Sequence, residues 1–210
     1  MMRMLSALLL CALAACAPAT EREASAEGTQ GPSAEAMSHE LGPYFHVETQ
    51  MHDRIRAAVG ASPADSWARM MIEHHRGEIA MARRLLQVTS AAEAQSLANA
   101  TIAERLADME QLEELVGSGQ PDYESAAIFL PAIDRMHDAM MAVPPENPVE
   151  DWVLKMLHHH QGAVEMADLL LARDKLPGPA RQVAETSRDQ QLAGMQQLRM
   201  LLAARTSPKL

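Results

Sequence analysis

The chain carries the same set of histidines and methionines twice. Residues 51–53 (Met-His-Asp) return as residues 136–138, and the pair 74–75 (His-His) returns as 159–160, each time 85 positions later. An ungapped internal period indicates one structural unit used twice. Imidazole and thioether groups are ligands of soft and borderline transition metals, whereas packing alone would favour repeating Leu, Ile and Val. We therefore predict that the duplication carries a metal site.

Helical geometry places these side chains on or beside one face of each long helix. At about 100° per residue, His74 lies at the centre of an apolar stripe, and His75 lies at its edge. A single inward His is usually a hydrogen-bonded core residue, but several buried imidazoles are costly unless a metal accepts a lone pair from each ring. The predicted metal ligands are His52, Met71, His74, His75 and Met81 in the first copy and His137, Met156, His159, His160 and Met166 in the second.

The ligand types favour copper. Thioether sulfur stabilises Cu(I), and imidazole binds Cu(I) or Cu(II), whereas zinc gains little from Met and is less favoured. None of the nine His has a Glu three residues before it, which argues against a di-iron centre. No Cys-x-x-Cys-His is present, which excludes covalent haem, while a non-covalent haem with His and Met ligands stays open. Because protons compete for imidazole, metal affinity should fall below about pH 6.

No arrangement of residues predicts catalysis. A hydrolytic triad and a nucleophile elbow are both absent from the sequence, and we predict neither catalytic residues nor an organic cofactor. The leading hypothesis is a copper buffer, scavenger or chaperone. The alternatives are an envelope structural or interaction module with buried polar His and a copper redox protein, although a blue-copper site would need a thiolate. The two copies could share one site or build separate ones, and sharing is favoured.

The N-terminus predicts export and a lipid anchor. An apolar stretch at residues 5–15 follows the single positive charge of Arg3 and is too short to span a bilayer as a mature helix. Residues 13–16 (Leu-Ala-Ala-Cys) resemble a bacterial lipobox, so we expect residues 1–15 to be a lipoprotein signal peptide and Cys16 to be lipidated. The alternative is a plain secretory signal. Residues 16–40 are rich in Ala, Glu, Ser, Gly and Pro and are typical of a flexible tether.

The rest of the chain predicts an all-α protein. Aromatic residues make up only 3% of it, and 13 of its 16 Met follow Cys16, so the core must be built from aliphatic and Met side chains. Helices are expected at about 43–59, 64–88, 91–116, 123–143, 148–173 and 178–204. Residues 41–120 and 121–206 would form two repeats of one domain, a ferritin-like four-helix bundle with two short accessory helices.

Charge and composition limit the partners. The formal net charge is −10 without a basic patch, so nucleic acid is not an expected partner. We expect a metal ion as the ligand and contact with the membrane through the lipid anchor only, on the periplasm-facing side of the cell envelope. A homo-oligomer and a protein that exchanges metal with this one stay open.

Residues 71–82 and 156–167 resemble the repeated signature of the domain-of-unknown-function family 305. The resemblance covers about residues 51–202 and includes all ten predicted ligands. It implies a ferritin-like fold, export and, as in some members, copper binding linked to copper tolerance. It does not imply a known enzyme activity.

Overall fold

The structure is a computed structural model that describes residues 41–206. The predicted signal peptide, Cys16 and the tether lie outside these residues. Within the described range the chain is helical and contains no strand, which confirms the predicted all-α class. The helices are α2 (Phe45–Ala57), α3 (Pro63–Val88), α4 (Ala92–Glu113), α5 (Tyr123–Ala127), α6 (Leu130–Met141), α7 (Pro148–Leu171) and α8 (Gly178–Thr206).

The two central helices, α3 and α7, begin with the same kind of cap. The Ser62 hydroxyl accepts a hydrogen bond from the amide of Asp65, and Pro63 occupies the first helical position. In α7 the Asn147 side chain accepts hydrogen bonds from the amides of Val149 and Glu150, and Pro148 is the first residue of the helix. Proline fits there because the first amides of a helix have no intrahelical acceptor. These caps explain why both starts were predictable to within one residue.

The second repeat departs from the prediction of a single helix over about residues 123–143. The structure has two helices there, the short α5 and then α6, separated by Ile128 and Phe129. Pro131 lies in the first turn of α6, where its ring excludes a continuous helix through the preceding turn and its nitrogen cannot donate. Phe129, which caps α6, is fully buried and anchors this break in the core.

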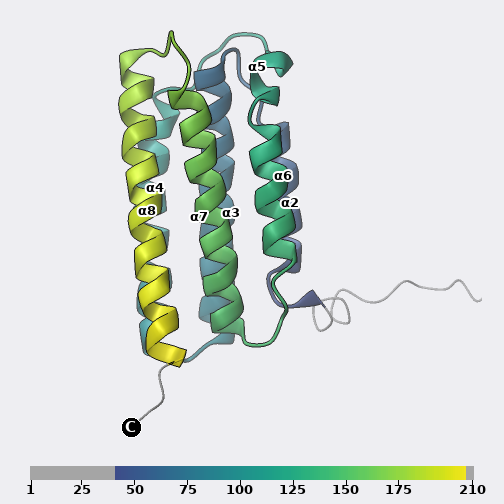
Figure 1. Ribbon diagram of the computed structural model, residues 1–210, viewed down its shortest axis with the longest axis vertical. Helices are drawn as coiled ribbons and strands as arrows, with labels where there is room; N and C mark the ends of the chain where they lie inside the picture. The colour runs from purple at the N-terminus through teal and green to yellow at the C-terminus, as the bar shows by residue number, and fades with distance from the viewer. Residues whose placement is uncertain (1–40, 207–210) are drawn as a thin grey trace, which may run out of the picture. The chain divides into compact units, whose positions relative to one another are not determined.

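The helices form two layers, one from each repeat. In Figure 1, α6, α7 and α8 lie nearer the viewer, and α2, α3 and α4 lie behind them; the paired helices also contact each other. Helices α3 and α4 form one hairpin and α7 and α8 the other, while α2 and α6 cover the remaining side of the central pair α3 and α7. This arrangement confirms a helical bundle of two hairpins with accessory helices, in which the repeats are related by a pseudo-two-fold axis.

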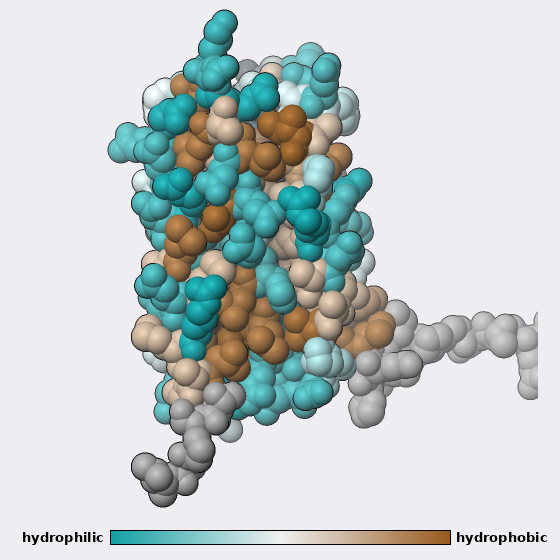
Figure 2. All heavy atoms as spheres, in the orientation of Figure 1, coloured by the Kyte–Doolittle hydropathy of each residue, from teal (hydrophilic) through white to brown (hydrophobic). Residues whose placement is uncertain are grey.

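The core repeats between the two layers. Trp67 and Trp152 are both fully buried, as are Tyr44 and Phe129, which also stand 85 positions apart. On the face formed by α6, α7 and α8, hydrophilic residues interleave with patches of hydrophobic ones (Figure 2). Of the helices in residues 41–206, none has the length and apolar character needed to cross a membrane.

Two glycines let the accessory helices approach the central ones. A Cβ on Gly77 would lie 2.2 Å from the sulfur of Met51 on α2, and a Cβ on Gly162 would lie 2.6 Å from the Cβ of Met136 on α6. Each Gly therefore makes room for the Met of its own repeat.

Replacing either glycine with alanine should lower stability. In Gly162→Ala the added Cβ meets the rigid first carbon of Met136, and overpacking of this kind costs about 1–3 kcal/mol, which outweighs the gain in helix propensity of about 1 kcal/mol. Gly178→Ala is the matched control because nothing lies within 4 Å of its Cβ. Chemical denaturation should show a loss for Gly77→Ala and Gly162→Ala only; equal stability of all three variants would contradict the packing role.

One buried ion pair joins the two layers. Lys155 on α7 donates to Glu48 on α2 at 2.9 Å and to the carbonyl oxygen of Met140 at 2.7 Å, and both charged side chains are almost fully buried. Burial raises the pKa of Glu48, and Lys155 opposes that rise. The positions related by the repeat carry Ile133 and Met70, both buried, so the same contact is apolar on the other side of the axis.

The role of this ion pair can be tested by replacing it with the apolar pair found at the matching positions of the other repeat. Lys155→Met alone should destabilise the protein by about 3 kcal/mol, because Glu48 is left buried without its partner. The double variant Glu48→Ile/Lys155→Met copies the apolar pair, and its stability should come within about 1 kcal/mol of the parent or exceed it. Urea denaturation of the three proteins measures both effects. A double variant as unstable as the single one would show that the ion pair is needed for the fold.

Candidate metal centre

The two His pairs meet where the central helices cross. His74 lies near the middle of α3 and His159 near the middle of α7, and their ring centroids are 3.6 Å apart. With its proton on Nε2, His74 donates to the carbonyl oxygen of His159 at 3.1 Å. Both rings are fully buried. The pseudo-two-fold axis therefore passes between these two imidazoles.

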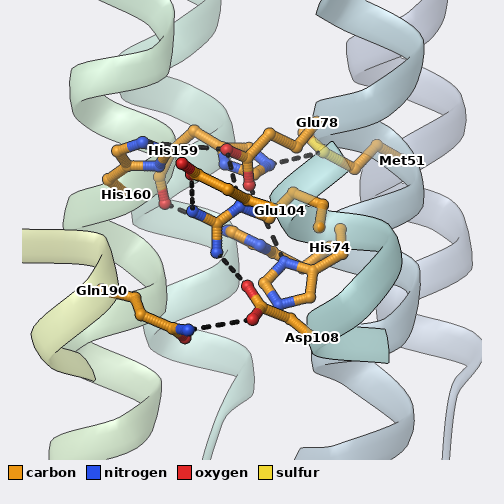
Figure 3. A network of polar contacts seen from close by, with 10 residues as sticks. Met51, His74, Glu78, Glu104, Asp108, His159, His160 and Gln190 are labelled. Atoms are coloured by element: carbon orange, nitrogen blue, oxygen red, sulfur yellow. Dashed lines mark hydrogen bonds and ion pairs between the residues drawn. The ribbon is translucent and has the colours of Figure 1, made fainter. Parts of the chain in front are cut away.

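A single carboxylate lies among the imidazoles. Glu78, one turn after His74 on α3, is fully buried, and its oxygens lie 3.7 Å from His75 Nδ1 and 3.8 Å from His160 Nε2. His74, Glu78 and His159 each offer a ligand atom, and these three atoms lie within 4.8 Å of one another. Figure 3 shows Glu78 facing His159 and His160 across the helices. Ligand groups of both repeats thus converge on one place.

A thioether completes the donor set. The sulfur of Met51, on α2, lies 3.1 Å from Nε2 of His159 and points to the same centre (Figure 3). Met51 is buried in the slot opened by Gly77. It was not among the predicted ligands. The repeated Met-His-Asp triplet is the sequence feature that points to it, but the sequence analysis predicts only the His of that triplet as a ligand.

An arginine balances the charge of the carboxylate. Nε of Arg105, on α4, lies 3.3 Å from Glu78, and the same guanidinium forms an ion pair with Asp108. Burial raises the pKa of Glu78, but Arg105, followed by His160, more than offsets this and holds that pKa well below its usual range. Glu78 is therefore ionised at neutral pH.

The centre is asymmetric because this charged group exists in one repeat only. The positions matching Glu78, Arg105 and Asp108 hold Ala163, Gln191 and Gly194. The repeat gives no signal for Glu78, since its counterpart in the second copy is an alanine. The packing of both His pairs around it gives it a central place instead.

The imidazoles are kept neutral by burial. Burial lowers the pKa of His159 to about 3 and that of His160 to about 4, and burial together with His159 lowers the pKa of His74 well below its ordinary value. Nδ1 of all three rings and both nitrogens of His75 have no hydrogen-bond partner. Neutral imidazoles with lone pairs free are the form that ligates metals. The donor set fits a metal ion.

The remaining predicted ligands lie in two other places. Met71, Met81, Met156 and Met166 are buried in the hydrophobic core, and within residues 41–206 none of their sulfurs makes a hydrogen-bonding contact with an imidazole. His52 and His137 stack on each other between α2 and α6, with ring centroids 4.1 Å apart, and Nε2 of His52 lies 3.0 Å from Asp134. The role of these six residues as ligands stays a prediction.

The family comparison agrees with the resemblance seen in the sequence. The sequence model of the family described as Domain of unknown function (DUF305) matches residues 12–116, half of the 210 residues. The chain belongs to this family. The match covers the first repeat of this DUF305 protein, and the second repeat follows it. No curated protein and no solved structure matches the chain, so the ferritin-like assignment of the bundle stays a prediction.

These rings should hold a metal down to a lower pH than the sequence predicts. Exposed imidazoles would lose metal below about pH 6, but protons compete here only near the lowered pKa values of about 4 for His160 and about 3 for His159. A loaded protein titrated with acid should release its metal below about pH 5. Release with a midpoint near 6.5 would contradict ligation by these buried His.

The metal-free protein should instead lose stability on acidification. The pKa values of His74, His159 and His160 are lower in the folded chain than in the unfolded one, so unfolding takes up protons between the two values. Stability is then complete above about pH 6.5 and declines as the pH falls toward about 4, the pKa of His160. Thermal unfolding at several pH values, with and without metal, measures the decline. An unchanged melting temperature from about pH 7 to 4 would argue against neutral buried rings.

Proposed function

We propose that this DUF305 protein is an exported copper-binding protein that acts as a buffer, scavenger or chaperone in metal tolerance. The observation that carries the proposal is the buried centre in which four imidazoles, from both repeats, surround Glu78 beside the sulfur of Met51. It contains the kinds of ligand that the duplicated sequence predicts.

A metal ion explains groups that are otherwise costly. Buried polar atoms without a partner each lose about 1–3 kcal/mol relative to water. Five imidazole nitrogens of this centre and both oxygens of Glu78 have no hydrogen-bond partner, although Arg105 compensates the charge of the carboxylate. One ligand atom each of His74, Glu78 and His159 lie within 4.8 Å of one another, so a single cation could satisfy these three together.

Copper suits these ligands better than zinc. Met51 adds a thioether to imidazole, a combination that stabilises Cu(I) and leaves Cu(II) accessible, while zinc gains little from sulfur of this kind. When bound, copper would supply a cationic centre able to accept these lone pairs in either oxidation state. His74 and His159, with Glu78, are the residues that would hold it, supported by His75, His160 and Met51.

Burial favours holding and transferring the metal over catalysis on a substrate. His74, His75 and His159 are fully buried, and none of them lines the surface cavity formed by residues 62–64 and 172–177 or the cavity beside Arg76. We propose no catalytic residues. The alternative of a purely polar core has its own support in the His74 to His159 hydrogen bond and the Glu78–Arg105 ion pair.

Export and anchoring remain part of the proposal on sequence grounds. The apolar segment 5–15 with the lipobox-like Cys16 supports a lipoprotein of the cell envelope, tethered by residues 16–40. A tethered buffer would exchange copper with a partner protein in the same compartment.

Metal retention separates the proposal from the polar-core alternative. Purified protein is loaded with Cu(I) under reducing conditions, with Cu(II) or with Zn(II), washed and analysed for metal. We expect copper to be retained in preference to zinc. Failure to retain any of the three ions would overturn the proposal.

A double variant tests whether the repeats share the centre. His74→Ala/His75→Ala should weaken copper binding more than about tenfold, since the rings of both repeats surround one carboxylate. The control is His158→Ala, an exposed His beside His159 on α7, which should leave binding unchanged. Circular dichroism checks that the bundle remains folded. Retention of half the copper at unchanged affinity would show two separate sites.

A further inference from the structure

A surface groove between α4 and α8 lies next to the metal centre. It is lined from α4 by Glu104, Arg105, Ala107, Asp108 and Gln111 and from α8 by Gln190, Ala193, Gly194 and Gln197. Most of these side chains are polar or charged. Arg105 and Asp108 are the buried members of the lining, and Arg105 also reaches Glu78. The groove and the centre thus share one side chain.

Gly194 brings the groove next to a ligand. A Cβ at this position would lie 2.8 Å from Nε2 of His160, so only a glycine leaves the ring this close to the α8 side of the groove. The matching residue of the first repeat, 86 positions earlier, is Asp108. The His160 ring therefore packs directly behind the groove at Gly194, and the matching position of the first repeat, which lines the same groove, carries a carboxylate.

Arg105 is shared among three carboxylates, of which Glu78 and Asp108 are buried and Glu104, 3.6 Å from its Nη2, is exposed. Its Nε faces Glu78 inside the centre, and its Nη1 contacts Asp108 at the groove. Gln190, reaching across from α8, donates to Asp108 at 2.9 Å and holds it in place (Figure 3). If the contact with Glu78 were broken, the guanidinium would therefore still have a fixed, buried acceptor in Asp108.

We infer that Arg105 is a displaceable counter-ion of Glu78 and that metal reaches the centre through the α4–α8 groove. An incoming cation takes the place of the guanidinium at Glu78, and Arg105 keeps its ion pair with Asp108. The inference rests on the proposed function, because it describes how the proposed site is filled. No bond other than ion pairs and metal ligation changes in this exchange.

The charges also define the class of ion that the centre prefers. The buried side chains of Glu78, Asp108 and Arg105 sum to one negative charge. A monovalent soft cation brings this group to neutrality, whereas a divalent one leaves an excess positive charge away from water. Arg105 therefore favours Cu(I)-like ions over divalent ones.

Substitution of Arg105 tests the exchange, with Ag(I) as a monovalent probe and Zn(II) as a divalent one. In the full chain, Arg105→Gln should bind Ag(I) about tenfold or more tightly, because a competing charge is removed, and Zn(II) should gain more than Ag(I). The metal-free variant should at the same time melt at a lower temperature. Arg188→Gln, at a partly exposed arginine on α8 that pairs with Asp168 and Asp189, is the matched control and should change neither affinity. Weaker Ag(I) binding by Arg105→Gln would overturn the exchange.

Asp108→Asn should change Ag(I) affinity in the opposite direction. Arg105 then has Glu78 as its remaining buried carboxylate, so Ag(I) affinity should fall about tenfold or more. A purely structural role of the network would move both variants in the same direction, which would refute the inference. This arm remains decisive where Arg105→Gln does not fold.

A kinetic experiment tests the route. Ala193→Trp fills the groove from an exposed position that touches no proposed ligand, and it should slow Ag(I) uptake and release together while leaving affinity unchanged. Ala103→Trp, exposed on α4 outside the groove, is the control. Uptake rates equal to those of the parent chain would exclude the groove as the route. Absence of Ag(I) and copper binding in the parent chain would instead refute the proposed function itself.

Discussion

The crossing of α3 and α7 at His74 and His159 is the contact on which the rest of the structure depends. Each central helix contributes a His at its midpoint, and the pseudo-two-fold axis passes between the two rings. Polar rings at the centre of an apolar bundle are unfavourable on their own. The surrounding features, from the glycine slots to the arginine on α4, either allow these rings to approach or compensate for their burial.

The accessory helices serve that crossing in unequal ways. Gly77 and Gly162 admit α2 and α6 close to the central helices. Within residues 41–206, however, the sulfur of Met51 and not that of Met136 contacts a ring of the centre, and the buried ion pair between the layers, Glu48–Lys155, comes from α2. That ion pair distinguishes the two faces of the α3–α7 pair. It favours the packing in which Glu48 of α2 meets Lys155 of α7 over one in which the two repeats exchange places.

Much of this arrangement was readable from the sequence because it follows from local rules. Ser62 and Asn147 mark helix starts through their caps, and the period of 85 residues brings equivalent His to equivalent places. Glu78 and Arg105 could not be identified this way, since each occurs in one repeat and their meeting depends on how α4 packs on α3. The direction of the Met51 sulfur likewise depends on the depth of α2, and the break between α5 and α6 on the single Pro131.

The unequal repeats have a consequence for how such a centre can exist at all. A symmetric dimer of one helical unit must place every residue twice, so a carboxylate beside the axis would face its own copy, and two buried anions would repel each other. Two units joined in one chain are free of that constraint. Glu78 can stand alone opposite Ala163, and Asp108 can stand opposite Gly194. Covalent linkage thereby permits an odd number of charged side chains beside a two-fold axis. In an assembly of identical subunits, every side chain beside the axis has a symmetry copy, so their number is even.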